Sequence, residues 1–185
     1  MTLSKNVPIS LAQLNALPEA PAKIWFSHAC AASTWINAMA QQRPYAGLDA
    51  LLDQAMKVWQ HCQSADYLEA FEAHPMIGDI NSLREKFAGT RGLASHEQSG
   101  ANHASEQTLI ELSQLNHQYR QQNGFIFIIC ATGLSANSML EALQIRIKNN
   151  PETELMNAAA EQIKISLLRL DKGIEKGLIT GLKTN

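Results

Sequence analysis

The sequence predicts an all-α, single-domain helical bundle of about seven to eight helices over residues 1–185. Along most of the chain, apolar residues recur at steps of three and four, which is the period of a helix with one buried face. Only residues 125–130 have the composition of a strand, and no second strand candidate exists to pair with them. The length of 185 residues, 45% of them hydrophobic, suits one sizeable core rather than two domains.

The first expected helices are bounded by capping residues and prolines. Ser10 is an N-cap for a short helix that stops before Pro18. The alanine-rich residues 24–39 then predict two helical segments that are broken near residues 32–33. This run ends at Arg43-Pro44, because the residue before a proline is disfavoured in helical geometry.

The next two helices lead to the first candidate site residue. Residues 48–60 repeat apolar side chains at steps of three and four, which predicts one buried helical face. Ser64 caps a further helix, and His74 lies at its C-terminal end. Residues 78–102 follow, where glycines among polar residues predict an interruption of regular structure. Long loops in compact domains are often functional.

The second half of the chain predicts three longer helices and one apolar segment. A helix covers residues 105–122 and ends at Gly124, and residues 125–130 form either a buried extended segment or a helix start. Ser135 opens a helix that stops at Asn149-Asn150-Pro151. The last helix covers residues 152–176 and ends at Gly177.

Composition excludes several classes of protein. The formal net charge is −2, 17% of residues are charged, and basic residues are scattered, so nucleic-acid binding is not expected. No stretch approaches the roughly 20 apolar residues of a membrane span, and the N-terminus has no apolar signal region, so we expect a cytoplasmic protein. The three cysteines, Cys30, Cys62 and Cys130, lie in apolar surroundings without a C-x-x-C pair and are expected to be reduced core thiols.

His74 is the first residue with a chemical interpretation. It precedes Pro75, which pushes it out of helical geometry, and Gly78 lets the backbone turn again. This arrangement can present a titratable imidazole to a pocket. Composition alone nevertheless favours a loop histidine without a role.

A carboxylate and an arginine are two further candidates. Glu97 beside Gln98 could transfer a proton and offer an amide to a polar heterocycle, although composition alone favours a solvated helix start. Arg146 lies between two isoleucines and either extends its charge to solvent or grips carboxylate or carbonyl oxygens. Metal binding is not predicted, because the six histidines include no H-x-x-x-H pair; a site of His74, His96 and Glu97 stays an alternative.

Taken together, these residues resemble a known family, 2-oxo-4-hydroxy-4-carboxy-5-ureidoimidazoline (OHCU) decarboxylase, the last enzyme of the route from urate to (S)-allantoin. The resemblance rests on four stretches in matching order, residues 74–78, 97–100, 124–130 and 146–149, followed by the long C-terminal helix. It implies a compact helical bundle, often a homodimer, that acts on a small ureidoimidazoline substrate and uses no metal or organic cofactor.

The resemblance also assigns roles to residues. It makes His74 the catalytic acid/base residue, Glu97 a polar partner of the heterocycle, the apolar stretch a pocket wall that offers backbone hydrogen bonds, and Arg146 a substrate-binding residue. The chemistry of decarboxylation, which needs two proton transfers, adds Glu97 as the second catalytic residue. The implied substrate-binding residues are Pro75, Ala94, Ser95, His96, Gln98, Phe125, Ile126, Phe127, Ile128, Ile129 and Arg146.

Three positions depart from the family pattern. Ala94 replaces a usual serine, although Ser95 is adjacent, so a substrate hydroxyl contact is in question. Ile126 replaces a common proline. Met76 replaces a frequent aspartate, so an aspartate at position 76 is not essential if the activity holds. Two other classes stay open: a helical interaction module that lost the activity, and a metal-dependent hydrolase that acts on a ureide.

Overall fold

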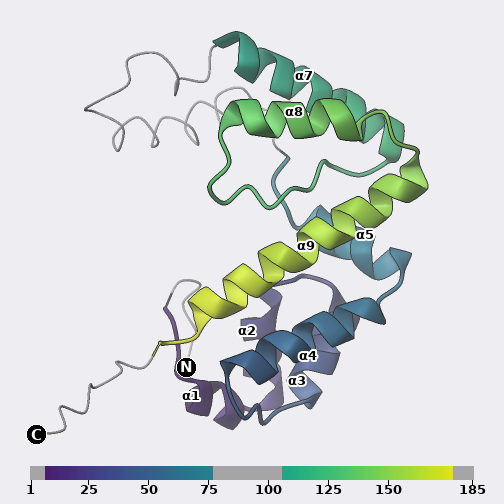
Figure 1. The fold of residues 1–185 in the computed structure, drawn as a ribbon. Coiled ribbons are helices and arrows are strands. Elements are labelled where there is room, and N and C mark those ends of the chain that lie inside the picture. Colours follow the sequence, from purple (N-terminus) through teal and green to yellow (C-terminus); the bar gives the residue numbers. More distant parts are fainter. Residues whose placement is uncertain (1–6, 77–105, 177–185) are drawn as a thin grey trace, which may run out of the picture. The chain divides into compact units, whose positions relative to one another are not determined.

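The computed structural model describes residues 7–76 and 106–176, and this part of the chain forms eight helices and no strand (Figure 1). The predicted all-α class is therefore confirmed. The chain divides into two compact units, one of residues 1–66 with 163–185 and one of residues 67–162. The expectation of a single domain stays a prediction.

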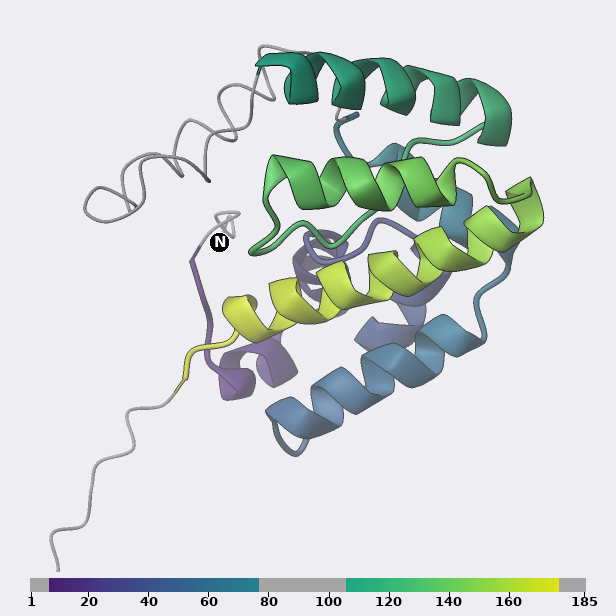
Figure 2. The ribbon, with the colours of Figure 1, turned by 45° about the horizontal axis from the view of Figure 1, so that its top comes forward.

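The first unit contains α1 (Leu11–Ala16), α2 (Glu19–Ser27), α3 (Ser33–Gln41) and α4 (Leu48–Gln60). Helix α2 packs on α3, and α3 packs on α4 (Figure 2). The boundaries of α4 and the break before Ser33 are those predicted from the sequence. The prediction for α2 was wrong at its start, because Pro18 both ends the first helix and serves as the N-cap of the next one.

The core of this unit is aromatic. The ring of Phe26 lies edge-on to Trp25, Trp35 and Tyr45, with centroid separations of 5.1, 6.0 and 6.4 Å. The indole Nε1–H of fully buried Trp35 donates to the carbonyl oxygen of Ala55 on α4 at 3.1 Å. Buried polar atoms are thus paired where the apolar faces of α3 and α4 meet.

Capping agrees with the sequence at α1 and differs at α5 (Ser64–Glu72). Ser10 Oγ accepts from the Gln13 N–H at 3.2 Å and Gln13 Oε1 accepts from the Ser10 N–H at 2.8 Å, which is a capping box. Ser64, expected to be an N-cap, is instead the first residue of α5. Asp66, the third residue of α5, accepts from the N–H of Gln63 through Oδ2 at 2.7 Å, which is one half of a capping box.

The second unit contains α7 (Glu106–Asn123) and α8 (Ala136–Arg146), which lie side by side in Figures 1 and 2. Gly124 ends α7 with a φ of 78°, in the left-handed region that glycine adopts without strain. Residues 125–130 are then neither helix nor strand, which decides between the two predicted alternatives in favour of an extended segment.

Helix α9 (Pro151–Gly173) begins with a proline at its first position, where the missing N–H costs nothing. It was expected to end at Gly177 but ends at Gly173. The reason is a long-range contact: the N–H of Ile9 donates to the Gly173 carbonyl, and the N–H of Glu175 donates to the Ile9 carbonyl, each at 3.0 Å. This pairing draws Ile174 into an isolated bridge with Ile9. Within the described ranges, no helix has both the length and the apolar character of a membrane span.

Candidate functional site

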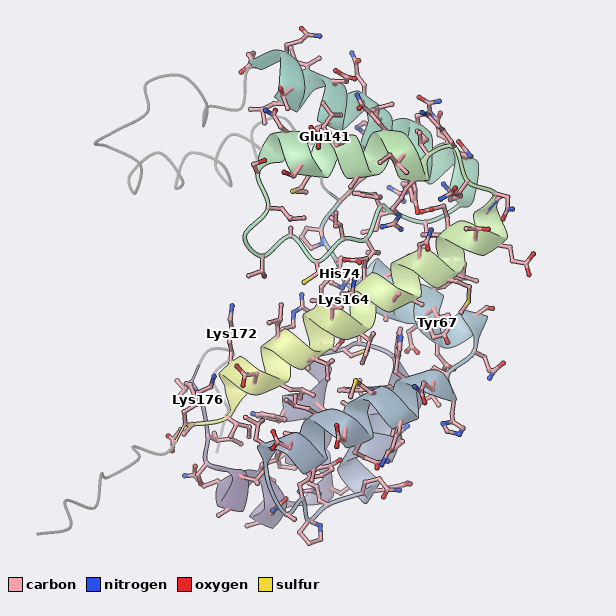
Figure 3. All side chains as sticks on the ribbon, viewed as in Figure 1. Tyr67, His74, Glu141, Lys164, Lys172 and Lys176 are labelled. Carbon is pink, nitrogen blue, oxygen red and sulfur yellow. The ribbon has the colours of Figure 1, made fainter. Side chains whose placement is uncertain are left out.

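His74 lies just beyond the end of α5, as predicted. Its backbone N–H donates to the carbonyl oxygen of Phe71 at 3.1 Å, so one turn closes after the helix, and Pro75 then prevents the helix from continuing. The imidazole is partly buried, and Figure 3 shows it against α9. The backbone thus fixes the direction in which the ring leaves the helix.

A glutamine on α9 holds the imidazole. His74 Nε2 lies 2.7 Å from Oε1 of Gln162, whose side chain has no exposed surface. The two residues are 88 positions apart in the chain. The hydrogen bond therefore depends on packing between α9 and the end of α5 and has no local sequence signal.

Arg146, at the end of α8, makes a buried network with Glu154 of α9. Its Nε and Nη2 lie 2.9 and 2.8 Å from Glu154 Oε2, with side-chain exposures of 12% for the arginine and 0% for the glutamate. Nη1 donates to the carbonyl oxygen of Ile128 at 2.7 Å, and Nη2 to the hydroxyl of Tyr119 at 3.4 Å. The guanidinium also lies over the ring of Phe127, 4.7 Å from its centroid.

Both oxygens of the Glu154 carboxylate are satisfied. Tyr119 donates its hydroxyl proton to Oε2 at 2.6 Å, while Asn149 and Asn157 donate to Oε1 at 2.7 and 2.8 Å. Burial raises the pKa of Glu154, but hydrogen bonds from Asn149, Tyr119, Arg146 and Asn157 lower it by more, so the pKa lies below its usual value. Burial, together with the hydrogen bond to Glu154, raises the pKa of Tyr119. The pair is therefore a carboxylate beside a neutral phenol.

These contacts shape the extended segment that sequence analysis assigned to the pocket wall. Phe125 packs against Phe71 and Tyr119, with centroids 5.4 and 5.9 Å away, and Phe127 lies 5.3 Å from Tyr119. Phe125, Phe127 and Ile128 are buried, whereas Ile126 and Ile129 are partly exposed.

The backbone of this segment is also held by charged side chains. Arg146 donates a hydrogen bond to the Ile128 carbonyl, and the Cys130 N–H donates to Glu161 Oε2 of α9 at 2.7 Å. Two of the backbone groups near the predicted substrate wall are therefore already paired within the protein. Of this segment, Ile126 and Ile129 keep the side-chain surface that a ligand could contact.

One stripe of α9 carries the contacts to Arg146, Cys130 and His74. Glu154, Glu161 and Gln162 occupy positions i, i+7 and i+8, which fall on one face of a helix together with buried Ala158 at i+4. Glu154 and Gln162 are separated by roughly 12 Å along the axis at 1.5 Å per residue. This stripe was not predicted, because its partners lie far away in the sequence and two carboxylates and an amide in a long helix are usually solvated.

Several predicted site residues lie outside the described residues. These are Ala94, Ser95, His96, Glu97 and Gln98. The structure thus places His74, Pro75, residues 125–129 and Arg146, and the roles assigned to all of them stay predictions. Pro75 is exposed and Met76 is partly exposed beside His74. In the described ranges, no three His, Cys, Asp or Glu side chains gather as metal ligands would.

A second arginine that binds a backbone carbonyl lies in the other unit. Arg169 Nη1 donates to the carbonyl oxygen of Ala29 at 3.2 Å. Burial lowers the pKa of this guanidinium, and the neighbouring Cys30 opposes the shift. Cys30 and Cys62 are buried, as expected for core thiols, whereas Cys130, also expected in the core, is partly exposed.

The sequence of this chain is similar to those of known proteins. A plant protein from Arabidopsis thaliana, the uric acid degradation bifunctional protein TTL, is 37% identical over 144 residues, which cover 77% of this chain and 44% of that protein. The mouse 2-oxo-4-hydroxy-4-carboxy-5-ureidoimidazoline decarboxylase is 28% identical over 140 residues, covering 76% of this chain and 75% of the mouse protein. The chain spans less than half the length of the bifunctional relatives it matches.

A solved structure and a family model agree with these relatives. The crystal structure of OHCU decarboxylase in the presence of (S)-allantoin is 34% identical in sequence, with a TM-score of 0.66 over 81% of this chain and 96% of that chain. The family model of OHCU decarboxylase matches residues 15–171. The chain therefore belongs to the OHCU decarboxylase family.

Proposed function

We propose that this protein decarboxylates 2-oxo-4-hydroxy-4-carboxy-5-ureidoimidazoline to (S)-allantoin in urate degradation. Family membership supports the reaction class, and a relative with 34% identity has been solved in the presence of (S)-allantoin. The observation that carries the proposal is the placement of His74. An imidazole that is fixed beyond a helix end by a proline and a buried amide is a suitable acid/base group.

The substrate supplies most of the chemistry. When the bond between the ring carbon and the carboxylate breaks, CO2 leaves and the electron pair of that bond forms a double bond to the neighbouring carbon. The electrons of the adjacent C=N move to the ring nitrogen, which takes up a proton from solvent, so the substrate itself accepts the electrons. The hydroxyl on the former carboxyl-bearing carbon then loses its proton and becomes a carbonyl. The carbon that bears the ureido group gains a proton on one face, which sets the S configuration. The protein must therefore orient the ring and move two protons.

We assign these proton transfers to His74 and to Glu97, which lies outside the described residues. Since titration near neutral pH is ordinary for imidazole, His74 can both accept and return a proton in one cycle. Gln98 and the neighbouring Ala94, Ser95 and His96 are assigned to the ring and its ureido arm by family resemblance alone.

The contacts of Arg146 support a role in holding residues 125–130, which form the proposed pocket wall. Its guanidinium has five N–H groups. Nε and Nη2 face Glu154, Nη2 also faces the Tyr119 hydroxyl, and one N–H of Nη1 donates to the Ile128 carbonyl. One N–H on Nη1 is left for a substrate oxygen. We propose that Arg146 mainly fixes the course of residues 125–130, and that Ile126 and Ile129 provide the apolar contact surface.

The direct test generates the unstable substrate from urate in situ and follows the circular dichroism of the product. Addition of the protein should accelerate the appearance of a circular dichroism signal with the sign of (S)-allantoin. Reactions without protein, and with a folded His74→Ala variant, provide the controls. No acceleration and no enantiomeric excess would contradict the proposal and leave an interaction module as the better interpretation.

The remaining expectations need separate measurements. From family resemblance we propose a cytoplasmic homodimer that uses no metal or organic cofactor, and sedimentation equilibrium tests the dimer. A metal-dependent hydrolase is tested by metal analysis of the purified protein and by treatment with a chelator. Activity that survives chelation, with release of CO2 and no ureide hydrolysis, would exclude that alternative.

A further inference from the structure

Gln162 is a buried amide whose contact with His74 has a chemical consequence. Its side chain is completely buried, and its Oε1 lies 2.7 Å from His74 Nε2. A carboxamide oxygen can accept a hydrogen bond but has no hydrogen to donate. With the amide oxygen placed toward the ring, the hydrogen in this bond belongs to the imidazole, on Nε2.

We propose that Gln162 is a positioning residue that fixes His74 in the Nε2–H tautomer, so that Nδ1 is the atom that exchanges a proton with the substrate. In neutral imidazole only one nitrogen carries hydrogen, and the partner of the other nitrogen decides which one. With Nε2 protonated, the lone pair resides on Nδ1. This proposal rests on the proposed function of His74 as the acid/base residue.

The surroundings make the tautomer specific. The backbone at His74 is held by the turn at Phe71 and by Pro75, and Gln162 is carried by the interior of a long helix. The carboxylate next to it, Glu161, is directed at the Cys130 N–H, and Glu72 at the end of α5 is exposed. The group on Nε2 is thus a neutral amide. A neutral amide stabilises imidazolium less than a carboxylate in the same place would.

The tautomer can be measured without any substrate. In the full chain labelled with 15N, two-bond proton–nitrogen correlation spectra distinguish Nδ1 from Nε2 and show which one carries hydrogen. Signals that disappear in the His74→Ala variant identify the ring among the six histidines. At a pH where His74 is neutral, we expect Nε2 to be protonated and Nδ1 to be unprotonated.

Two substitutions at Gln162 test different consequences of its contact with His74. Gln162→Met preserves volume but removes the acceptor, so the spectrum should change to a mixture of tautomers, and kcat should fall by about tenfold to a hundredfold, approaching the usual size of acid/base effects. KM should change little, because the buried amide cannot touch a substrate. Gln162→Glu should raise the pKa of His74 by about one unit and move the acidic limb of the pH–rate profile upward.

Gln144 offers a matched control. Its Nε2 donates to Glu111 Oε1 at 2.7 Å, so Gln144→Met also removes one side-chain hydrogen bond within the same unit. That variant should keep the His74 tautomer and its kcat. If wild type shows hydrogen on Nδ1, or if Gln162→Met leaves both the tautomer and kcat unchanged, the proposal is overturned. If the tautomer is as expected but wild type forms no allantoin, only the proposed function fails.

Discussion

Arg146 and Glu154 are joined at one carboxylate oxygen, Oε2, which accepts from both Nε and Nη2 of the arginine at 2.9 and 2.8 Å. The pair links the end of α8 to the first turn of α9, while Nη1 of the same arginine holds the Ile128 carbonyl. One buried guanidinium therefore connects two helices and the extended segment between α7 and α8. This connection makes the pair sensitive to removal of either partner.

Removing the arginine should destabilise the protein strongly. Arg146→Met leaves the Glu154 carboxylate buried without its counter-charge, and we expect the free energy of unfolding to fall by about 3 kcal/mol, at the lower end for broken buried pairs because three neutral donors remain. Urea unfolding measures this loss. The exposed pair of Lys23 and Glu19, 2.6 Å apart, is the control, and Lys23→Met should cost less than about 1 kcal/mol. Equal losses in both variants would contradict a special role for the buried pair.

A double variant separates structural and substrate roles of Arg146. In Arg146→Met with Glu154→Gln, no unpaired charge is left, so much of the lost stability should return. If Arg146 acts mainly by holding the wall, the KM of the folded double variant should rise by no more than about threefold, since one missing hydrogen bond to substrate would cost more. A rise of a hundredfold at unchanged secondary structure would instead assign the arginine to the substrate.

Acid should weaken the protein through Glu154. Its pKa in the folded state lies below the ordinary value of 4.5, so the unfolded chain binds a proton more readily. The stabilisation is complete above the unfolded pKa of about 4.5 and is lost as the pH falls through the folded pKa. The unfolding free energy should therefore decrease from roughly pH 5 downward. Glu154→Gln should flatten this decrease, and an identical decrease in both proteins would show that other groups cause it.

Cys62 should be slow to react with alkylating reagents. Burial, followed by the nearby Asp66 and Cys30, raises the pKa of its thiol to about 12, and its Sγ lies 3.5 Å from the carbonyl oxygen of Val58. At pH 8 only about one thiol in ten thousand would be ionised. Iodoacetamide labelling of the native protein, read by peptide mass spectrometry, should modify the partly exposed Cys130 first. Labelling of Cys62 at the same rate would contradict its burial.

The sequence was most informative where the determining interactions are local. The helical period of residues 48–60 predicted α4 with its observed boundaries, and the His74-Pro75 pair predicted a histidine just past a helix end. Both depend on backbone preferences within a few residues. The same reasoning could not find the end of α9, because pairing with Ile9 determines it from the far end of the chain.

Long-range polar contacts explain what the sequence missed at the candidate site. Arg146 was expected to meet solvent or substrate, yet its partners come from positions 119, 128 and 154. Gln162 had no signal of its own, since an amide in a long helix is usually solvated. Only packing brings it to His74. Residue types thus indicated the chemistry, whereas the partners that orient each group are set by the three-dimensional packing.

The central claim is that His74 is the acid/base residue of the proposed decarboxylation. The initial rate of (S)-allantoin formation from substrate generated in situ, compared between wild type and His74→Ala, tests it most directly. Far-ultraviolet circular dichroism and urea unfolding confirm that the variant is folded. We expect the wild-type protein to form (S)-allantoin enantioselectively, and the folded variant to lose on the order of a hundredfold or more in rate. A folded His74→Ala protein that produces (S)-allantoin at the wild-type rate would contradict the central claim.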